Sequence, residues 1–111
     1  MGDPAASQIS EAMNRLWQKF LPQMEERVAT LQSATTQLAN RATLTLEEQS
    51  GAAADAHKLA GVLGTFGLKE GTELAREAES LFEGPPDALP ASLSRLTSIT
   101  GQLKAMIADR A

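Results

Sequence analysis

His57 is the side chain best suited to take part in a reaction, because the 111-residue chain contains one histidine and no cysteine. A neutral imidazole keeps a free lone pair and can act as a nucleophile, a general base or a metal ligand. The chain has no P-loop, no glycine-rich nucleotide loop and no compact Asp/Glu cluster of the kind that holds magnesium. We therefore expect no metal, cofactor or ATP site in this chain.

Small residues surround His57 on a helical projection at about 100° per residue. An apolar stripe lies on the opposite side and consists of Leu59, Val62, Leu63 and Phe66. The face of His57 holds Ala53, Ala54, Ala60, Gly61 and Gly64, with Lys58 and Thr65 on one flank. A glycine inside a helix costs up to about 1 kcal/mol relative to alanine, so something other than helix stability favours these glycines. The pattern predicts an imidazole that faces away from the core and is open to a partner surface, although an ordinary surface histidine beside tightly packed helices fits it too.

The segment 56–68 resembles the signature of histidine phosphotransfer domains. That family has a leucine or similar residue two positions after its histidine, a glycine four positions after it, and an apolar residue and a glycine nine and ten positions after it. Leu59, Gly61, Phe66 and Gly67 occupy these positions. The family commonly has a lysine three positions after the histidine, where this chain has Ala60.

The resemblance implies that His57 accepts a phosphoryl group through Nε2 from an aspartyl phosphate of a receiver domain and passes it to another receiver. The chain would then be a phosphoryl carrier rather than an enzyme, with magnesium on the partner receiver. Lys58 and Lys69 are candidates for the charge that the lysine supplies in relatives. The docking face for the receiver would comprise Ala53, Ala54, Ala60, Gly61, Gly64 and Thr65. We expect a monomer.

Two other functions stay open. One is the phosphoacceptor domain of a chemotaxis-type histidine kinase, a family that often places a glutamate near the histidine to help activate it. The nearest acidic residue in sequence is Asp55, which the projection places toward the core, and this disfavours the kinase interpretation. A helical bundle that docks a receiver without accepting phosphate is the other alternative, and the absence of a lysine at position 60 is compatible with it.

The composition and periodicity predict an all-α fold. Alanine, leucine, glutamate and glutamine are abundant, and aromatic residues make up 4% of the chain. A first helix is expected over about 7–40, continuous but kinked at Pro22, because the apolar stripe keeps its phase across the proline. That stripe contains Ile9, Met13, Leu16, Phe20, Met24, Val28, Leu31 and Leu38. Trp17, beside it, is expected to pack between helices.

Three more helices complete the predicted antiparallel up-and-down four-helix bundle, a single domain over 1–111 with a flexible segment 1–6. The second begins near Leu46 after a capping box of Thr45 and Glu48 and ends near Phe66, before a left-handed cap at Gly67. The third covers 69–83 with Leu74, Ala75, Ala78, Leu81 and Phe82 inward, and a loop over 84–88 leads to a last helix over 89–109. Leu93, Leu96, Ile99, Leu103 and Met106 form its apolar side.

Charge and hydropathy limit the kinds of partner. The formal net charge is −4, and no basic stripe is present, which argues against nucleic acid. No apolar run approaches the roughly 20 residues needed to span a bilayer, and the N-terminus lacks the features of a signal peptide, so we expect no membrane contact and a cytoplasmic location. The acidic residues Glu70, Glu73, Glu77 and Glu79 are expected to form a solvated face of the third helix.

Overall fold

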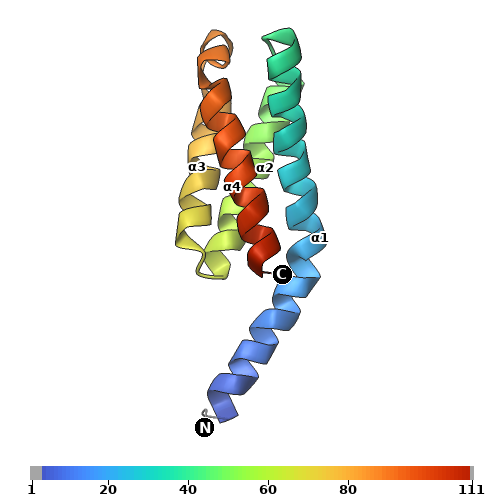
Figure 1. Ribbon diagram of the computed structural model, residues 1–111, viewed down its shortest axis with the longest axis vertical. Coiled ribbons are helices and arrows are strands. Elements are labelled where there is room, and N and C mark those ends of the chain that lie inside the picture. Colours follow the sequence, from blue (N-terminus) through green and yellow to red (C-terminus); the bar gives the residue numbers. More distant parts are fainter. Residues whose placement is uncertain (1–3, 111) are drawn as a thin grey trace.

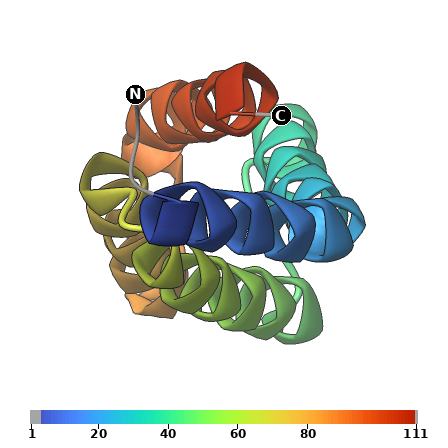
Figure 2. The same ribbon diagram turned by 90° about the horizontal axis from the view of Figure 1, so that it is seen from below.

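A computed structural model describes residues 4–110, and its four helices run alternately up and down (Figure 1). They are α1 (Pro4–Arg41), α2 (Leu46–Thr65), α3 (Lys69–Glu83) and α4 (Leu93–Arg110), and the described residues contain no strand. Viewed from below, the helices surround a common interior (Figure 2). The predicted all-α antiparallel four-helix bundle is therefore confirmed.

Helix α1 is one continuous helix with Pro22 inside it, as the phase of its apolar stripe predicted. It bends in the light blue part of Figure 1, and its N-terminal part projects beyond the ends of the other helices. It begins at Pro4 rather than near Ser7, so residues 4–6 belong to the helix, while 1–3 lie outside the described residues. Ile9 does not belong to the core, because no other helix reaches that far, and it is 65% exposed. The fully buried part of the α1 interface starts at Trp17.

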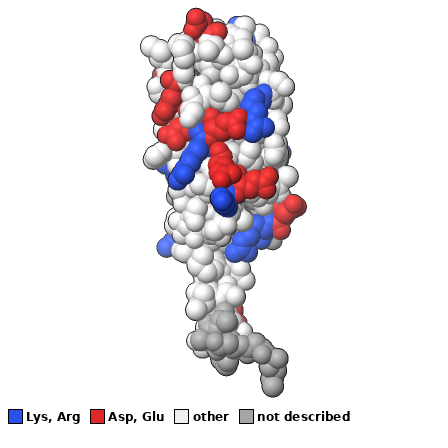
Figure 3. All heavy atoms as spheres, turned by 90° about the vertical axis from the view of Figure 1, so that its left-hand side faces the viewer, with Lys and Arg blue, Asp and Glu red and all other residues white. Residues whose placement is uncertain are grey.

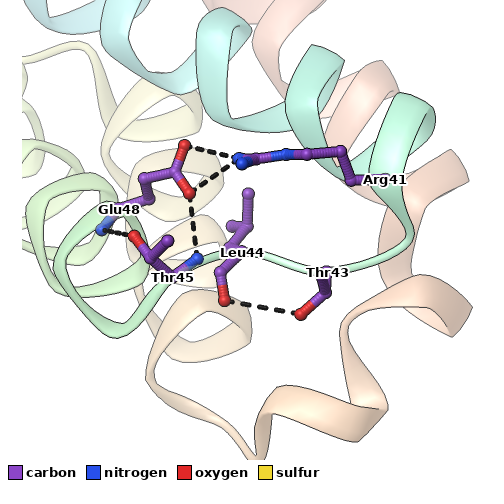
Figure 4. Close-up of polar contacts among 5 residues, drawn as sticks. All are labelled: Arg41, Thr43, Leu44, Thr45 and Glu48. Atoms are coloured by element: carbon purple, nitrogen blue, oxygen red, sulfur yellow. Dashed lines mark hydrogen bonds and ion pairs between the residues drawn. The ribbon is translucent and has the colours of Figure 1, made fainter.

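The N-terminus of α2 is fixed by the predicted capping box (Figure 4). The Thr45 hydroxyl accepts a hydrogen bond from the Glu48 amide at 3.0 Å, and the Thr45 amide donates to Glu48 Oε1 at 2.9 Å. Arg41 Nη2 donates to both oxygens of the same carboxylate, at 2.7 and 2.6 Å. The Thr45 amide, and after it the Arg41 guanidinium, hold the pKa of Glu48 below its usual value. Glu48 thus links the end of α1 to the start of α2.

The turn between α2 and α3 depends on Gly67, which adopts φ +71°. A residue with a Cβ is disfavoured in this left-handed conformation. The Gly67 amide donates to the Gly64 carbonyl at 3.1 Å, and the Leu68 amide donates to the Leu63 carbonyl at 3.0 Å. These are the two hydrogen bonds of a Schellman motif, so the predicted left-handed cap is confirmed and α3 is reversed against α2.

The core lies between the four helices and is built from aliphatic side chains. Leu59 and Leu63 of α2 are fully buried and lie on the side of that helix that the projection predicted. On α3, the predicted inward residues Leu74, Ala75, Ala78 and Phe82 are buried, while Leu81 is half-buried at the margin of the core. Trp17 packs between helices as expected, with its ring edge-on to Phe66, the C-cap residue of α2, at a centroid distance of 5.0 Å.

The segment before α4 differs from the prediction. Helix α4 begins at Leu93 and not near Leu89, because Pro86–Ala88 and Pro90–Ser92 form two short 3₁₀ turns. Each turn has a proline at its first position, where the missing amide hydrogen costs no hydrogen bond. Leu89 lies between the two turns and is buried, so this segment closes the end of the core.

Candidate functional site

His57 stands on the outer side of α2, and its side chain is 73% exposed. On the other side of the helix, Ala56, Leu59 and Leu63 are completely buried. This packing holds the backbone of α2 in place while the imidazole stays accessible. The prediction that His57 faces away from the core is confirmed.

Glu79 of α3 is the hydrogen-bond partner of the imidazole. Its Oε2 lies 2.9 Å from His57 Nδ1, and its side chain is 21% exposed. Sequence reasoning placed Glu79 on a solvated face and so missed this contact. The positions did contain a signal, because His57 lies as many residues before Leu68 as Glu79 lies after it. An antiparallel hairpin that turns at Gly67 and Leu68 brings two such residues together.

The Glu79 contact determines which imidazole nitrogen carries the proton. An ionised carboxylate only accepts hydrogen bonds, so Nδ1 of a neutral His57 must donate. The lone pair then lies on Nε2, and no hydrogen bond to Nε2 occurs among the described residues. Asp55 is the acidic residue nearest to His57 in the sequence, but its Oδ1 accepts a hydrogen bond from Nη1 of Arg27 on α1 at 3.1 Å. The carboxylate that hydrogen-bonds to the imidazole therefore comes from α3 and not from the helix of His57.

Two open hollows lie between α2 and α3, and His57 and Glu79 line both of them. The smaller, of about 330 Å³, extends toward the C-terminal half of α2 and is also lined by Ala60, Gly61, Arg76 and Ser80. The larger, of about 630 Å³, extends toward the start of α2 and is also lined by Leu46, Gln49, Ser50, Ala53, Ala54, Lys58, Phe82 and Glu83. The imidazole is therefore reachable from both directions along the helix pair.

The expected small-residue face around His57 is only partly exposed. Ala54, Gly61, Gly64 and Thr65 are exposed as predicted. Ala53 and Ala60 are instead buried, at 7% and 5% exposure. They lie on the flank of α2 against which α3 packs, and the projection of a single helix does not reveal the position of its neighbour. A Cβ added at Gly61 would meet nothing within 4 Å, so the space above this residue is free.

The two candidate lysines differ in their distance from the imidazole. Lys58 is exposed and lines the larger hollow together with His57. Lys69 is the first residue of α3 and lies on the order of 15 Å along that helix from Glu79. This separation makes Lys58 the nearer of the two candidates, and a role for Lys69 stays a prediction. Arg76, which sequence reasoning overlooked, lines the smaller hollow with His57.

Some of the acidic side chains on α3 form ion pairs, whereas others are only solvated. Glu70 and Glu73 are exposed as predicted, but Glu77 accepts a hydrogen bond at 2.7 Å from Nη2 of Arg95 on α4. This contact lowers the pKa of Glu77. Acidic and basic side chains accordingly lie close together on the face that contains α3 (Figure 3).

Metal clusters and membrane-spanning helices are both absent from the part of the chain that the structure describes. No group of three or more His, Cys, Asp or Glu side chains there is arranged to hold a metal ion. No helix there is both long enough and apolar enough to cross a membrane.

Similarity to known proteins extends over most of the chain. The sequence profile described as "Hpt domain" matches residues 15–110, whereas no curated protein and no solved structure matches. Hpt domains are phosphoryl carriers with a histidine phosphotransfer role in phosphorelays, and they interact with receiver domains. The matched residues include all of α2, α3 and α4 and most of α1, and hence both His57 and Glu79. The length of this match shows that the chain belongs to the Hpt domain family.

Proposed function

We propose that His57 is the phosphoryl acceptor and donor of this Hpt domain. It takes the group from an aspartyl phosphate on one receiver domain and passes it to the aspartate of another. The observation that carries the proposal is the exposed imidazole, whose Nδ1 is engaged by Glu79 while Nε2 is free. A nucleophilic histidine needs this combination of access and a defined tautomer.

The transfer exchanges one bond for another. The lone pair on His57 Nε2 attacks phosphorus in line with the aspartyl oxygen. The new N–P bond forms as the P–O bond breaks, and the aspartate leaves with the electron pair as a carboxylate. The proton stays on Nδ1, where the Glu79 carboxylate stabilises the positive charge that develops on the ring. The reverse sequence of events transfers the group to a second receiver.

The remaining parts of the reaction are assigned to the receiver. It would supply the magnesium ion that neutralises the phosphoryl oxygens, together with its acidic pocket. This chain would contribute the nucleophile on a rigid helix and an unobstructed approach over Ala54, Gly61, Gly64 and Thr65. Ala53 and Ala60 lie beneath that surface, where their small size allows α3 to pack close to α2.

The test compares wild type with His57→Gln in the presence of a receiver labelled on its aspartate. Wild type should acquire an acid-labile, base-stable label, and the variant should acquire none. Circular dichroism should remain helical for both proteins, because the side chain is exposed. A label that persists in the variant would overturn the proposal. Receiver binding by wild type without any label would support a docking module that does not transfer.

A second candidate function is favoured by Glu79. A phosphoacceptor domain of a chemotaxis-type kinase often has a glutamate near its histidine, and the 2.9 Å contact removes the reason for disfavouring that interpretation. In that case, an ATP-binding kinase domain would phosphorylate His57 directly. Labelling with such a kinase domain and ATP, compared with labelling by a phosphorylated receiver, distinguishes the two sources of phosphate.

A further inference from the structure

We propose that Arg76 binds the phosphoryl oxygens while the group is on His57, in place of the lysine that is absent at position 60. The inference rests on the proposed role of His57 and assigns a second residue to the same reaction. It follows from the position, the surroundings and the charge of the Arg76 side chain.

The position of Arg76 is set by α3. It lies three residues before Glu79, so both side chains share one face of the helix. Glu79 reaches the imidazole directly, and Arg76 lines the adjoining hollow together with His57. The hollow of about 330 Å³ remains open because α2 contributes only Ala60 and Gly61 to it besides the histidine. A phosphoryl group on His57 could therefore be approached by the guanidinium without displacing a side chain of α2.

Arg76 differs from three other arginines of the chain in having no carboxylate partner. Three arginines bind carboxylates, namely Arg27 with Asp55, Arg41 with Glu48 and Arg95 with Glu77. Within residues 4–110, Arg76 forms no ion pair with an acidic side chain, and no hydrogen bond of its guanidinium is present. Glu79, the carboxylate in the same hollow, is engaged by His57. Arg76 thus retains its donors for an incoming anion.

The chemistry of the ligand matches a guanidinium. A phosphoryl group brings roughly two negative charges and three strong acceptor oxygens. The fixed fork of arginine can bind two such oxygens at once. A cation is also needed there because the Glu79 carboxylate beside the imidazole would repel the phosphoryl oxygens. Lys58 is the competing candidate, and it lines the other hollow, which also contains Glu83.

The experiment follows label transfer from a phosphorylated receiver to wild type, Arg76→Gln and Arg76→Lys. Arg76→Gln should transfer at least about tenfold more slowly, the change expected when a hydrogen bond to a charged group is lost. It should also shorten the lifetime of phospho-His57 after the receiver is removed. Arg76→Lys should recover part of both effects, since it restores the charge without the fork. Arg15→Gln, the same change at an exposed position of α1, is the control and should behave as wild type.

Binding and compensation measurements separate a role in phosphoryl transfer from a role in receiver docking. The affinity of Arg76→Gln for the unphosphorylated receiver should stay within about twofold of wild type, which corresponds to less than 1 kcal/mol. Arg76→Lys is the compensating variant, since it restores the charge, and its affinity for the receiver should likewise stay within about twofold of wild type. If Arg76→Gln transfers the label as fast as wild type and its phosphohistidine lives as long, the inference is overturned. It is also overturned if the variant loses receiver affinity by the same factor as it loses rate. If wild type itself acquires no label from a receiver, the proposed function fails and not the assignment of Arg76 alone.

Discussion

At the scale of single residues, the reactivity of His57 depends on a carboxylate that belongs to another helix. Glu79 is held by α3 and contacts Nδ1, while the rest of the ring faces solvent. The contact fixes the orientation of the ring as well as its tautomer, and both affect the access of Nε2 to phosphorus. The free space above Gly61 is the other local requirement, because a receiver must approach the imidazole closely.

Replacing Glu79 by alanine should increase the fraction of His57 with its proton on Nε2. We expect transfer to slow by roughly tenfold to a hundredfold, by analogy with the loss of the carboxylate partner of a metal-binding histidine. The nitrogen chemical shifts of the imidazole measure the tautomer, and label transfer measures the rate. Glu73→Ala removes a charge from an exposed position of the same helix and is the control. An unchanged tautomer and rate in Glu79→Ala would refute the role of this contact.

A larger side chain at Gly61 should increase the stability of the protein and decrease phosphoryl transfer. Gly61→Gln is expected to raise the free energy of unfolding by about 0.5 to 1 kcal/mol, because glycine is a poor helix former and the added atoms meet no neighbour. The same side chain should suppress transfer by holding the receiver away from His57. Urea denaturation and label transfer provide the two measurements.

Gly51→Gln is the matched control for this prediction. Gly51 is also exposed in α2 with nothing within 4 Å of an added Cβ, but it lies about 120° around the helix from His57. The substitution should stabilise the protein to a similar extent and leave transfer unchanged. Equal transfer by both variants would show that the helix face at Gly61 does not limit the approach of the receiver.

At the scale of helices, the two ends of α2 determine where His57 lies relative to α3. The capping box at Thr45 starts the helix, and the Schellman motif at Gly67 ends it and reverses the chain. Because α3 follows after so short a turn, its register against α2 has little freedom. Gln49 adds a second link, since its buried amide donates to the carbonyls of Phe82 and Gly84 at 2.7 and 2.8 Å. The hydrogen bonds at the two ends of α2 thus help to set the register that brings His57 next to Glu79.

The capping carboxylate should make stability depend on pH. Its hydrogen bonds to Thr45 and Arg41 lower the pKa of Glu48 from its usual value near 4.5. The folded state therefore prefers the ionised form, and the stabilisation is present above about pH 4.5 and is lost as the pH falls through the lowered pKa. Glu48→Gln should be less stable than wild type at pH 7, and the difference should shrink at pH 3. Urea midpoints at the two pH values test this, and a constant difference would contradict it.

At the scale of the whole molecule, α1 has two parts with different roles. Its C-terminal part packs in the bundle, whereas its N-terminal part extends past the other helices (Figure 1). Trp17 is the first fully buried side chain along the described part of α1 and so marks the start of the packed part. Its ring contacts Phe66 at the C-cap of α2, and the guanidinium of Arg110 from α4 lies 5.1 Å from its centroid. Three helices therefore meet at this side chain.

Trp17→Ala should destabilise the protein by about 3 to 5 kcal/mol, the usual cost of removing a buried aromatic side chain. Removing residues 1–11 should change stability by no more than about 0.5 kcal/mol, because the side chains of 7–11 are exposed. Urea denaturation followed by circular dichroism measures both changes. A large loss of stability in the shortened chain would mean that the projecting part of α1 contributes to the core.

The sequence alone determined the features that depend on neighbouring residues. Apolar periodicity predicted the helices, including the continuity of α1 through Pro22, and local hydrogen-bonding preferences predicted the caps at Thr45 and Gly67. The exposure of His57 followed from its position opposite the apolar stripe of α2. Each of these results depends on interactions within a few positions of the chain, so the order of residues is sufficient to predict them.

Only the tertiary structure decided which side chains from different helices meet. It placed Glu79 on the imidazole, brought Arg76 to the adjoining hollow, and buried Ala53 and Ala60 against α3. It also left Ile9 exposed, although its spacing matches the apolar stripe. A helical projection gives the faces of one helix but not the position of the helices around it. The environment of His57 is formed by such contacts between helices, and for this reason the sequence identified the reactive residue but not the groups that surround it.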